Sequence, residues 1–222
     1  MRQAIMTSPG QIEIRDVPEP ACAPDQVLVR VRRIGICGSD VHVYHGTHPF
    51  TGYPVVQGHE FSGQIVQVGS AVDDPQLRPG VKVTCETQRT CRRCRPCRSG
   101  RYHLCDELRV MGFQTPGAAQ ELVALPAEKV IALPDAFSFD QGALMEPAAV
   151  GVHATARAGV NPGDCVLVIG AGPIGMMAAL AARARSAATV LISEPSAARR
   201  QVARKLGFEQ LIDPREQPLP ES

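Results

Sequence analysis

Residues 165–182 read CVLVIGAGPIGMMAALAA, a run of eighteen residues without a charged side chain. The β-branched segment 166–169 is typical of a buried strand, and segment 176–182 is rich in the helix-favouring residues Met, Ala and Leu. Between these segments lies Gly-Ala-Gly-Pro, a turn sequence. The run is long enough for a membrane span, but the turn in its middle favours a strand that leads into a helix.

The glycines of this turn have the spacing of a dinucleotide-binding motif. Gly170, Gly172 and Gly175 form G-x-G-x-x-G, in which the first glycine allows a tight turn, the second lets the backbone approach a pyrophosphate, and the third lets helix and strand pack closely. Glu194 follows the next apolar run, residues 189–193. Its carboxylate can accept both ribose hydroxyls and would repel a 2′-phosphate, so the pattern predicts NAD rather than NADP. The alternative is that Glu194 is a solvated carboxylate at a strand end.

The rest of the chain shows two patterns. Up to about residue 150, short apolar runs alternate with Gly and Pro turns, which predicts a rolled β-domain with strands at 11–17, 27–36, 61–68, 81–85 and 121–125. From about residue 151 the order is strand, helix, strand, helix, strand, with the second helix at about 196–206 and the third strand at 208–213. Residues 214–222 (PREQPLPES) form a polar segment that we expect to be a flexible tail.

Four cysteines form the densest chemical signal in the sequence. Cys91, Cys94, Cys97 and Cys105 follow the spacing C-x-x-C-x-x-C-x7-C. This stretch contains almost no apolar side chains, so burial cannot order it, whereas a Zn²⁺ ion bound by four thiolates can supply roughly 10 kcal/mol or more of apparent folding free energy. We expect a closed zinc site whose negative charge is offset by the neighbouring arginines, which are Arg92, Arg93, Arg95, Arg98 and Arg101.

Other roles for these cysteines fit less well. A bacterial-type iron–sulfur motif ends in C-x-x-x-C-P, whereas here the last gap is seven residues and Asp106 follows. The first residues, MRQAIMTSPG, lack the pattern of a signal segment, so we expect a reducing, cytoplasmic location rather than a disulfide framework. The formal net charge is +1 and no aromatic ladder accompanies the arginines, which argues against a nucleic-acid or membrane partner.

A second candidate metal centre is scattered along the chain. Cys37 begins Cys-Gly-Ser-Asp-Val-His after one expected strand, His59 and Glu60 lie in Gly-His-Glu before another, and Glu146 lies in Met-Glu-Pro. One thiolate, one imidazole and two carboxylates form the mixed donor set of a catalytic rather than a structural zinc. Taken singly, the cysteine could be a packing residue and the histidine a satisfied core or surface group.

These motifs together resemble a known family. C-G-S-D-x-H, G-H-E, the cysteine quartet, M-E-P and G-A-G-P-I-G, in this order and spacing, resemble the zinc-dependent medium-chain dehydrogenase/reductase superfamily, from the first residues to about Asp213. Glu146, where alcohol dehydrogenases proper carry a cysteine, and the run EPAAVGVHA at 146–154 resemble the branch of sorbitol, galactitol, threonine and sugar-acid dehydrogenases. The resemblance implies hydride transfer to NAD from a secondary alcohol: a polyol, a sugar acid or a hydroxy amino acid.

The same resemblance implies two zinc ions in each chain. It implies that Cys37 and His59 bind a catalytic zinc, and that Glu60 and Glu146 ligate this zinc directly or through water. It assigns a structural zinc to the quartet of Cys91, Cys94, Cys97 and Cys105.

Further roles also follow from the resemblance. Ser39 and His42 match the family's proton relay, which passes the alcohol proton through the cofactor ribose toward solvent. Pro173, Ile174 and Arg199 join the three glycines and Glu194 as expected cofactor-binding residues.

The resemblance finally implies the domain organisation. We expect a GroES-like zinc-binding catalytic domain at 1–150, with a structural zinc lobe at about 89–106, and the first half of an NAD-binding Rossmann domain at 151–213. The family's Rossmann domain has further strands for the nicotinamide half, so the chain is C-terminally truncated relative to that pattern, and we expect it not to turn over substrate by itself. Full-length relatives are expected to be homo-oligomers. The alternative function is a non-catalytic zinc-containing remnant or nucleotide-binding module.

Overall fold

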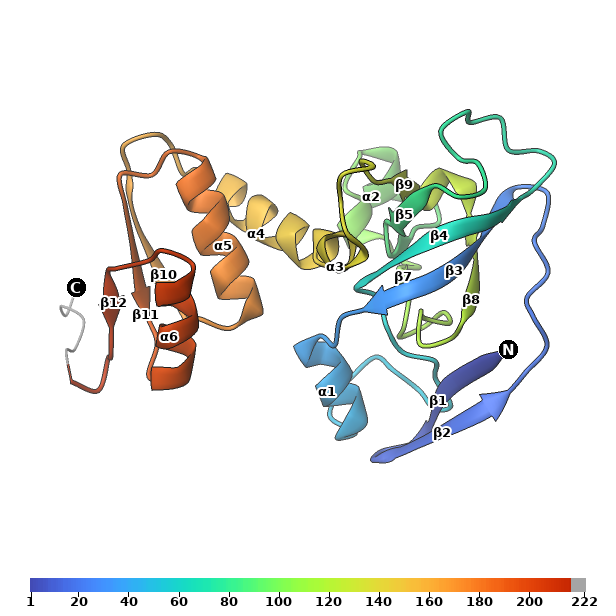
Figure 1. Cartoon of the computed structure of the whole chain (residues 1–222), viewed down its shortest axis with the longest axis horizontal. Helices are drawn as coiled ribbons and strands as arrows, with labels where there is room; N and C mark the ends of the chain where they lie inside the picture. Colours follow the sequence, from blue (N-terminus) through green and yellow to red (C-terminus); the bar gives the residue numbers. More distant parts are fainter. Residues whose placement is uncertain (217–222) are drawn as a thin grey trace. The chain divides into compact units, whose positions relative to one another are not determined.

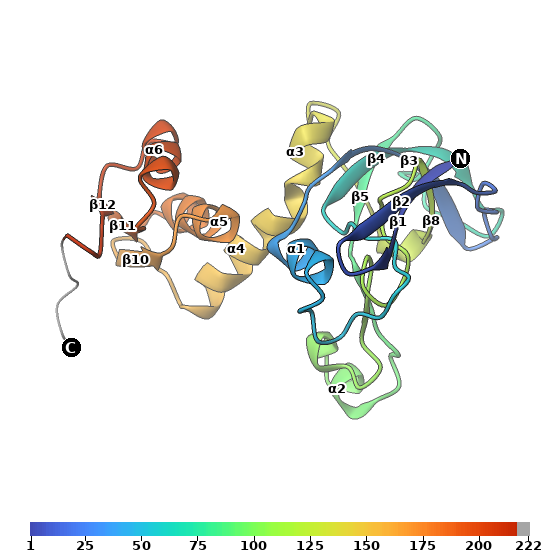
Figure 2. The same cartoon turned by 90° about the horizontal axis from the view of Figure 1, so that it is seen from below.

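The computed structural model describes residues 1–216 and divides the chain into two compact units, Met1–Met145 and Glu146–Ser222. Each unit has hydrophobic clusters of its own. Figures 1 and 2 show the strands of the first unit in blue to olive yellow and the helices and strands of the second unit in golden yellow to red.

The first unit is built around a five-stranded sheet in the order β8-β3-β4-β5-β9. All neighbouring strands of this sheet are antiparallel. Its core contains alternate residues of the strands, such as Phe61 and Ile65 of β4, because successive side chains of a strand point to opposite faces. The strands are β3 (Gln26–Ile34), β4 (Phe61–Val68), β5 (Lys82–Cys85), β8 (Leu122–Pro126) and β9 (Val130–Ala132).

Two small strand pairs and several short helices complete this unit. β1 (Arg2–Ser8) pairs with β2 (Gln11–Asp16), and β6 (Gln88–Arg89) pairs with β7 (Arg109–Val110). The short helices are α1 (Gly38–Tyr44), α2 (Arg95–Arg98), η1 (Tyr102–Leu104), η2 (Ala127–Lys129) and α3 (Phe139–Ala143). Figure 2 shows α2 in a lobe that extends away from β3, β4 and β5.

The second unit is a parallel sheet of three strands in the order β10-β11-β12. Its strands are β10 (Cys165–Ile169), β11 (Thr189–Ser193) and β12 (Leu211–Ile212), and its helices are α4 (Met145–Arg157), α5 (Pro173–Ala184) and α6 (Ala197–Lys205). Helices α5 and α6 lie on the same face of the sheet (Figure 1), where Met176, Ala179 and Ala203 pack with Ile192 and Phe208. No helix within residues 1–216 is long and apolar enough to cross a membrane.

From β10 onward the expected order of strand, helix, strand, helix, strand is confirmed, but it is preceded by the helix α4 (Met145–Arg157), which was not predicted. Two of the expected elements also differ in extent. The third strand covers only Leu211–Ile212 instead of 208–213, because it pairs with β11 at two positions alone. Helix α5 begins at Pro173, three residues before the helix-favouring run, since proline is well suited to a first helical turn. Of the expected tail, residues 214–216 form a turn, and residues 217–222 lie outside the described part of the chain.

Candidate metal centres and nucleotide site

The cysteine quartet lies in a loop closed by the β6–β7 pair. The Sγ atoms of Cys91, Cys94, Cys97 and Cys105 all lie within 4.8 Å of one another. A tetrahedral zinc with Zn–S bonds of about 2.3 Å needs sulfur atoms about 3.8 Å apart, so the four thiols surround a volume of suitable size. Main-chain N–H groups donate to two of the sulfurs: Cys91 N to Cys105 Sγ at 3.2 Å, and Cys94 N to Cys91 Sγ at 3.3 Å.

The charges around the quartet favour a cation at its centre. Main-chain N–H groups of Cys94 and Arg93 lower the pKa of Cys91 to about 7, whereas burial and the neighbouring cysteines raise the pKa of Cys97 to about 12. Four thiolates at these distances repel one another, so full ionisation requires a bound cation. Of the arginines, Arg93 pairs with Glu107 at 2.7 Å and also interacts with Cys91, and Arg92 pairs with Glu128 at 2.8 Å.

A second group of metal-ligating side chains forms where β3 ends and β4 begins. The antiparallel register pairs Ile34 with Phe61, so the loop after β3 and the loop before β4 lie next to each other. As a result, one ligand atom each from Cys37, His59 and Glu60 falls within 4.8 Å of the others. His59 and Glu60 are buried, and Cys37 is half-buried.

This second group has an electrostatic setting suited to a metal. The His59 imidazole, followed by the Ser39 side chain and N–H, lowers the pKa of the Cys37 thiol against the opposing effect of burial. A lower pKa increases the fraction of thiolate, which is the form that binds zinc.

Asp40 supports this group, although its role is not evident from the sequence. Its carboxylate accepts a hydrogen bond from Cys37 N at 2.9 Å and from Gln57 Nε2 at 3.2 Å, and its Oδ1 lies 3.8 Å from His59 Nδ1. A carboxylate that faces a ligating histidine orients the ring and raises its basicity. The sequence does contain one indication of this role: Asp40 lies three residues after Cys37. At this spacing a side chain at the start of a helix can accept a hydrogen bond from the main-chain N–H of the residue that precedes the helix.

A glycine and an aromatic ring shape the space around Glu60 and His59. A Cβ added to Gly35 would lie 2.4 Å from Glu60 Oε2, so a larger residue at this position would displace the carboxylate from where it now lies. The Phe113 ring lies 4.9 Å from the His59 ring, centroid to centroid, and stacks on His48 at 4.8 Å.

The remaining residues expected at this centre lie on helices. Ser39 and His42 are both in α1, where His42 is exposed and its Nδ1 lies 3.3 Å from Thr47 Oγ1. Glu146 lies in the first turn of α4, in the second unit, and its role as a ligand stays a prediction.

The glycine turn of the second unit joins β10 to α5. Gly170 has a φ angle of 96°, in the left-handed region that favours glycine. A Cβ on Gly175 would lie 1.9 Å from the Gly170 carbonyl oxygen, so the turn closes only with glycine there. A Cβ on Gly172, at the N-cap of α5, would meet nothing within 4 Å. The open side of Gly172 therefore lies at a helix N-terminus, where unpaired N–H groups can bind an anion. Ile174, in the first turn of α5, is exposed.

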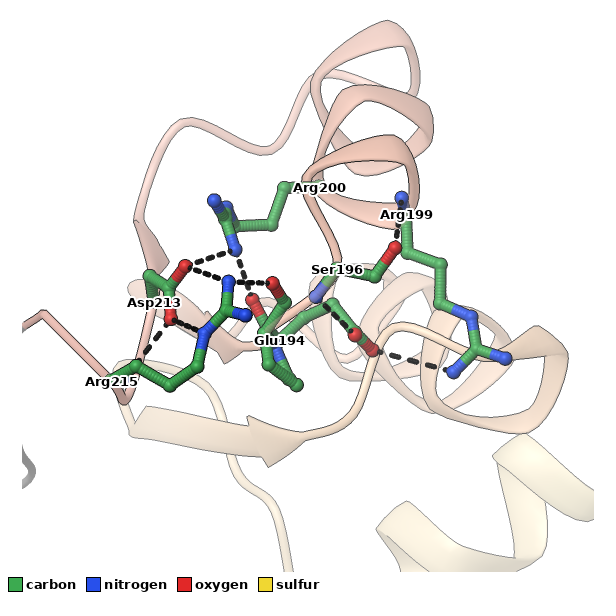
Figure 3. A network of polar contacts seen from close by, with 7 residues as sticks. Glu194, Ser196, Arg199, Arg200, Asp213 and Arg215 are labelled. Carbon is green, nitrogen blue, oxygen red and sulfur yellow. Dashed lines mark hydrogen bonds and ion pairs between the residues drawn. The ribbon is translucent and has the colours of Figure 1, made fainter.

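Glu194 connects this turn to the end of β11. Its carboxylate is buried and accepts a hydrogen bond from Ala171 N of the glycine turn at 2.8 Å. It also accepts one from Ser196 N at 2.8 Å (Figure 3). Ser196, then Ala171 and Arg199, lower the pKa of Glu194, so it is ionised at neutral pH. Arg199 Nη1 lies 3.7 Å from Glu194 Oε2 and is largely exposed.

Comparison with known proteins agrees with this arrangement. Residues 23–135 match the family described as the alcohol dehydrogenase GroES-like domain. The chain belongs to the zinc-type medium-chain dehydrogenase superfamily. Its first unit is accordingly the GroES-like part of this superfamily, and its second unit corresponds to part of the Rossmann region.

Individual relatives of the superfamily align with nearly the whole chain. A sorbitol dehydrogenase of Bacillus subtilis is 38% identical over 225 residues, which covers 98% of this chain and 62% of the relative. An L-threonine 3-dehydrogenase of Rhizobium etli is 38% identical over 218 residues, covering 96% of this chain and 62% of the relative. The crystal structure of a zinc-binding dehydrogenase from Sinorhizobium meliloti bound to NADP superposes with a TM-score of 0.92 at 35% identity, over 98% of this chain and 63% of that one. The chain thus spans less than two thirds of the length of these relatives.

Proposed function

We propose that the chain is part of a zinc-dependent oxidoreductase that transfers a hydride from a secondary alcohol to NAD. The observation that carries this proposal is the group of Cys37, His59 and Glu60, whose ligand atoms lie within 4.8 Å of one another. This donor set is mixed and compact, which suits a zinc that keeps one position open for substrate. The named relatives act on sorbitol and on L-threonine, so a polyol, a sugar acid or a hydroxy amino acid is the proposed substrate class.

The proposed catalytic zinc fits the residues that surround it. Cys37 and His59 would hold it, with Glu60 as a direct or water-mediated ligand, and Asp40 would keep the His59 ring in orientation. Glu146 is proposed as a further direct or water-mediated ligand on the family resemblance alone. When bound, zinc supplies a Lewis acid that lowers the pKa of a substrate hydroxyl, and the nicotinamide supplies the hydride acceptor. The thiolate and carboxylate charges offset the charge of the ion.

Ser39 and His42 have the proposed role of moving the alcohol proton away from the site. Ser39 lies two residues after Cys37 and interacts with its thiol, and His42 lies one turn further along α1 at the surface. A half-buried hydroxyl and an exposed imidazole on one short helix suit a path from the site toward solvent.

NAD is the proposed cofactor, bound by its adenosine half at the turn between β10 and α5. The N-terminus of α5 is open to the pyrophosphate, because the turn before it is formed by Gly170, Gly172, Pro173 and Gly175. The Glu194 carboxylate has lone pairs for the ribose hydroxyls in addition to those that accept hydrogen bonds from Ala171 N and Ser196 N. The ionised Glu194 would repel a 2′-phosphate, which supports NAD over the NADP seen in the Sinorhizobium meliloti structure. Ile174 and Arg199 complete the proposed cofactor contacts.

A structural zinc at Cys91, Cys94, Cys97 and Cys105 is the second proposed metal. It would hold the lobe together in place of a hydrophobic core, because the large apolar side chains of this stretch, Tyr102 and Leu104, are exposed.

Substitution of the catalytic zinc by Co²⁺ tests the function without requiring turnover. The visible spectrum of cobalt at the Cys37, His59 and Glu60 centre is expected to shift when a polyol, an aldonate or threonine is added. Cys37→Ser or His59→Ala should abolish this shift and, in a full-length enzyme, alcohol oxidation, while ADP-ribose binding remains. A cobalt spectrum that no alcohol changes would instead support the non-catalytic alternative.

A further inference from the structure

A second buried carboxylate, that of Asp213, lies near Glu194 and contacts the turn after β11 through two arginines (Figure 3). Asp213 directly follows β12 and is 6% exposed. Its Oδ2 lies 2.9 Å from Arg200 Nη1, and this same nitrogen donates to the main-chain oxygen of Glu194 at 2.6 Å. Arg215 donates to both carboxylate oxygens of Asp213, at 2.9 and 2.6 Å, and to the main-chain oxygen of Pro195 at 2.5 Å.

We propose that Asp213 is a positioning residue for the carboxylate of Glu194, acting through Arg200 and Arg215. This inference rests on the proposed nucleotide site, and it assigns to Asp213 the control of how tightly, and how selectively, the unphosphorylated ribose is bound.

The strand pairing explains why this turn needs such support. The β11–β12 register pairs only Ile192 with Leu211 and Ser193 with Ile212, and the last main-chain bond of the ladder runs from Glu194 N to Ile212 O at 2.9 Å. Beyond that bond, the carbonyl groups of Glu194 and Pro195 have no strand partner, and the two arginines donate to them instead. Since Asp213 binds both guanidinium groups, one carboxylate fixes two consecutive peptide units.

The geometry of the turn sets the direction of the Glu194 side chain. Glu194 Oε1 accepts from Ser196 N, two residues along the same turn, and Oε2 accepts from Ala171 N of the glycine turn. A rotation of the peptide units at 194 and 195 would therefore move Ser196 N and turn the carboxylate away from Ala171. Charge-assisted hydrogen bonds resist such a rotation more strongly than neutral ones.

Asp213 also forms ion pairs with two guanidinium groups, those of Arg200 and Arg215. The pKa of Asp213 is held far below its ordinary value, mainly by Arg215 and also by Arg200, so it is ionised at neutral pH. If Asp213 were uncharged, Arg200 and Arg215 would have no carboxylate to pair with, although both lie close to Glu194, the proposed ribose-binding residue. They would then be available to pair with Glu194 or with a 2′-phosphate, which reduces the preference for an unphosphorylated ribose.

Calorimetric titration of the zinc-loaded chain with ADP-ribose and with 2′-phospho-ADP-ribose tests this role. Asp213→Asn keeps the size of the side chain and removes its charge; we expect it to weaken ADP-ribose binding by about tenfold, as loss of a charge-assisted contact allows, and to narrow the difference between the two ligands. Arg200→Met should act in the same direction on ADP-ribose and provides a second variant if Asp213→Asn fails to fold. Arg204→Met, at an exposed position of the same helix, is the matched control and should leave both affinities unchanged.

A double-mutant cycle separates positioning from general support of the fold. If Asp213 acts through Glu194, Asp213→Asn has no further effect on ADP-ribose affinity in the Glu194→Gln background. An equal loss in both backgrounds would overturn the proposal, as would wild-type affinity in both Asp213→Asn and Arg200→Met. Absence of ADP-ribose binding by the unmodified chain would overturn the proposed nucleotide site as well, so the two failures are distinguishable.

Discussion

Two glycines, one in each unit, occupy positions where a side chain would collide with a group that the proposed sites need. Gly35 leaves space for the Glu60 carboxylate, and Gly175 leaves space for the Gly170 carbonyl. The nearest atom to Gly175 is a main-chain oxygen, whereas the nearest atom to Gly35 is a carboxylate oxygen at the end of the Glu60 side chain. Glu60 is buried, and its carbonyl also accepts from Gly35 N at 2.6 Å.

Gly35→Ala is expected to remove metal from the catalytic centre and leave the quartet loaded. The new Cβ would displace Glu60 Oε2, which lies 2.4 Å away, and disturb one of the three grouped ligands. Zinc analysis after dialysis should show one equivalent lost. Gly52→Ala is the matched control, because a Cβ there meets nothing within 4 Å; equal zinc content in both variants would show that Glu60 does not contribute to binding.

Asp213 gives the second unit an acid-sensitive contribution to stability. Its pKa is lower in the folded chain than in the unfolded chain, so it stabilises the fold fully above about pH 4, and this contribution is lost as the pH falls further. The free energy of unfolding of Asp213→Asn should therefore change less than that of the unmodified chain between about pH 5 and pH 2. Denaturant titrations across this range provide the measurement; identical pH profiles would contradict the assignment.

Among the elements, the strand–turn–helix unit of β10 and α5 contains two glycines with different roles: one is needed for folding and the other for nucleotide binding. Gly175→Ala places a Cβ 1.9 Å from a main-chain oxygen, so the turn must open and the second unit should lose stability. Gly172→Ala places a Cβ in open space, so stability should stay within about 1 kcal/mol, whereas the backbone can no longer approach a pyrophosphate. Thermal unfolding and ADP-ribose titration of both variants distinguish these effects. Normal ADP-ribose affinity in a folded Gly172→Ala variant would contradict the proposed site.

The zinc lobe between β6 and β7 is expected to lose its structure when zinc is removed. Its main-chain N–H groups at Cys91 and Cys94 donate to sulfur atoms whose positions depend on the ion, while the β3–β4 pair has hydrogen bonds of its own. After chelation, hydrogen exchange should become rapid in residues 90–108 and stay slow in β3 and β4. Unchanged protection of the lobe without metal would argue against a structural zinc.

Element types were predictable from the sequence where periodicity or turn chemistry was strong. The run after Cys165 contains β-branched residues, then glycines, then helix formers, and it folds as a strand, a turn and a helix. The helix α1 was not predicted, because its seven residues are too few to show a helical period. The strand β12 was predicted at 208–213, but its length was not, since pairing with β11 rather than local composition sets where it begins and ends.

Candidate site residues with distinctive chemistry were also visible, whereas their supporting partners were not. Cysteines at regular spacing and a Gly-His-Glu segment stand out in a sequence. Asp40, Arg200 and Asp213 do not, because their roles arise from residues that the fold brings near them, such as His59 and the carbonyl of Glu194.

At the scale of the whole molecule, the two units contain separate cores and separate candidate sites. The first unit has both groups of metal-ligating side chains, and the second has the glycine turn with Glu194. Within the described residues, β10 is an edge strand, and its side chains Leu167 and Ile169 are 45% and 77% exposed. Exposed apolar side chains at a sheet edge favour association, so we expect the isolated chain to be poorly soluble.

Zinc content of the purified chain, compared with that of Cys37→Ser and Cys97→Ser, tests the central claim most directly. Two zinc ions are expected in each unmodified chain and one in each variant, with the sulfur-rich X-ray absorption signature of the quartet retained only in Cys37→Ser. A single zinc in the unmodified chain that Cys37→Ser leaves in place would show that Cys37, His59 and Glu60 do not bind metal, and would contradict the proposed chemistry.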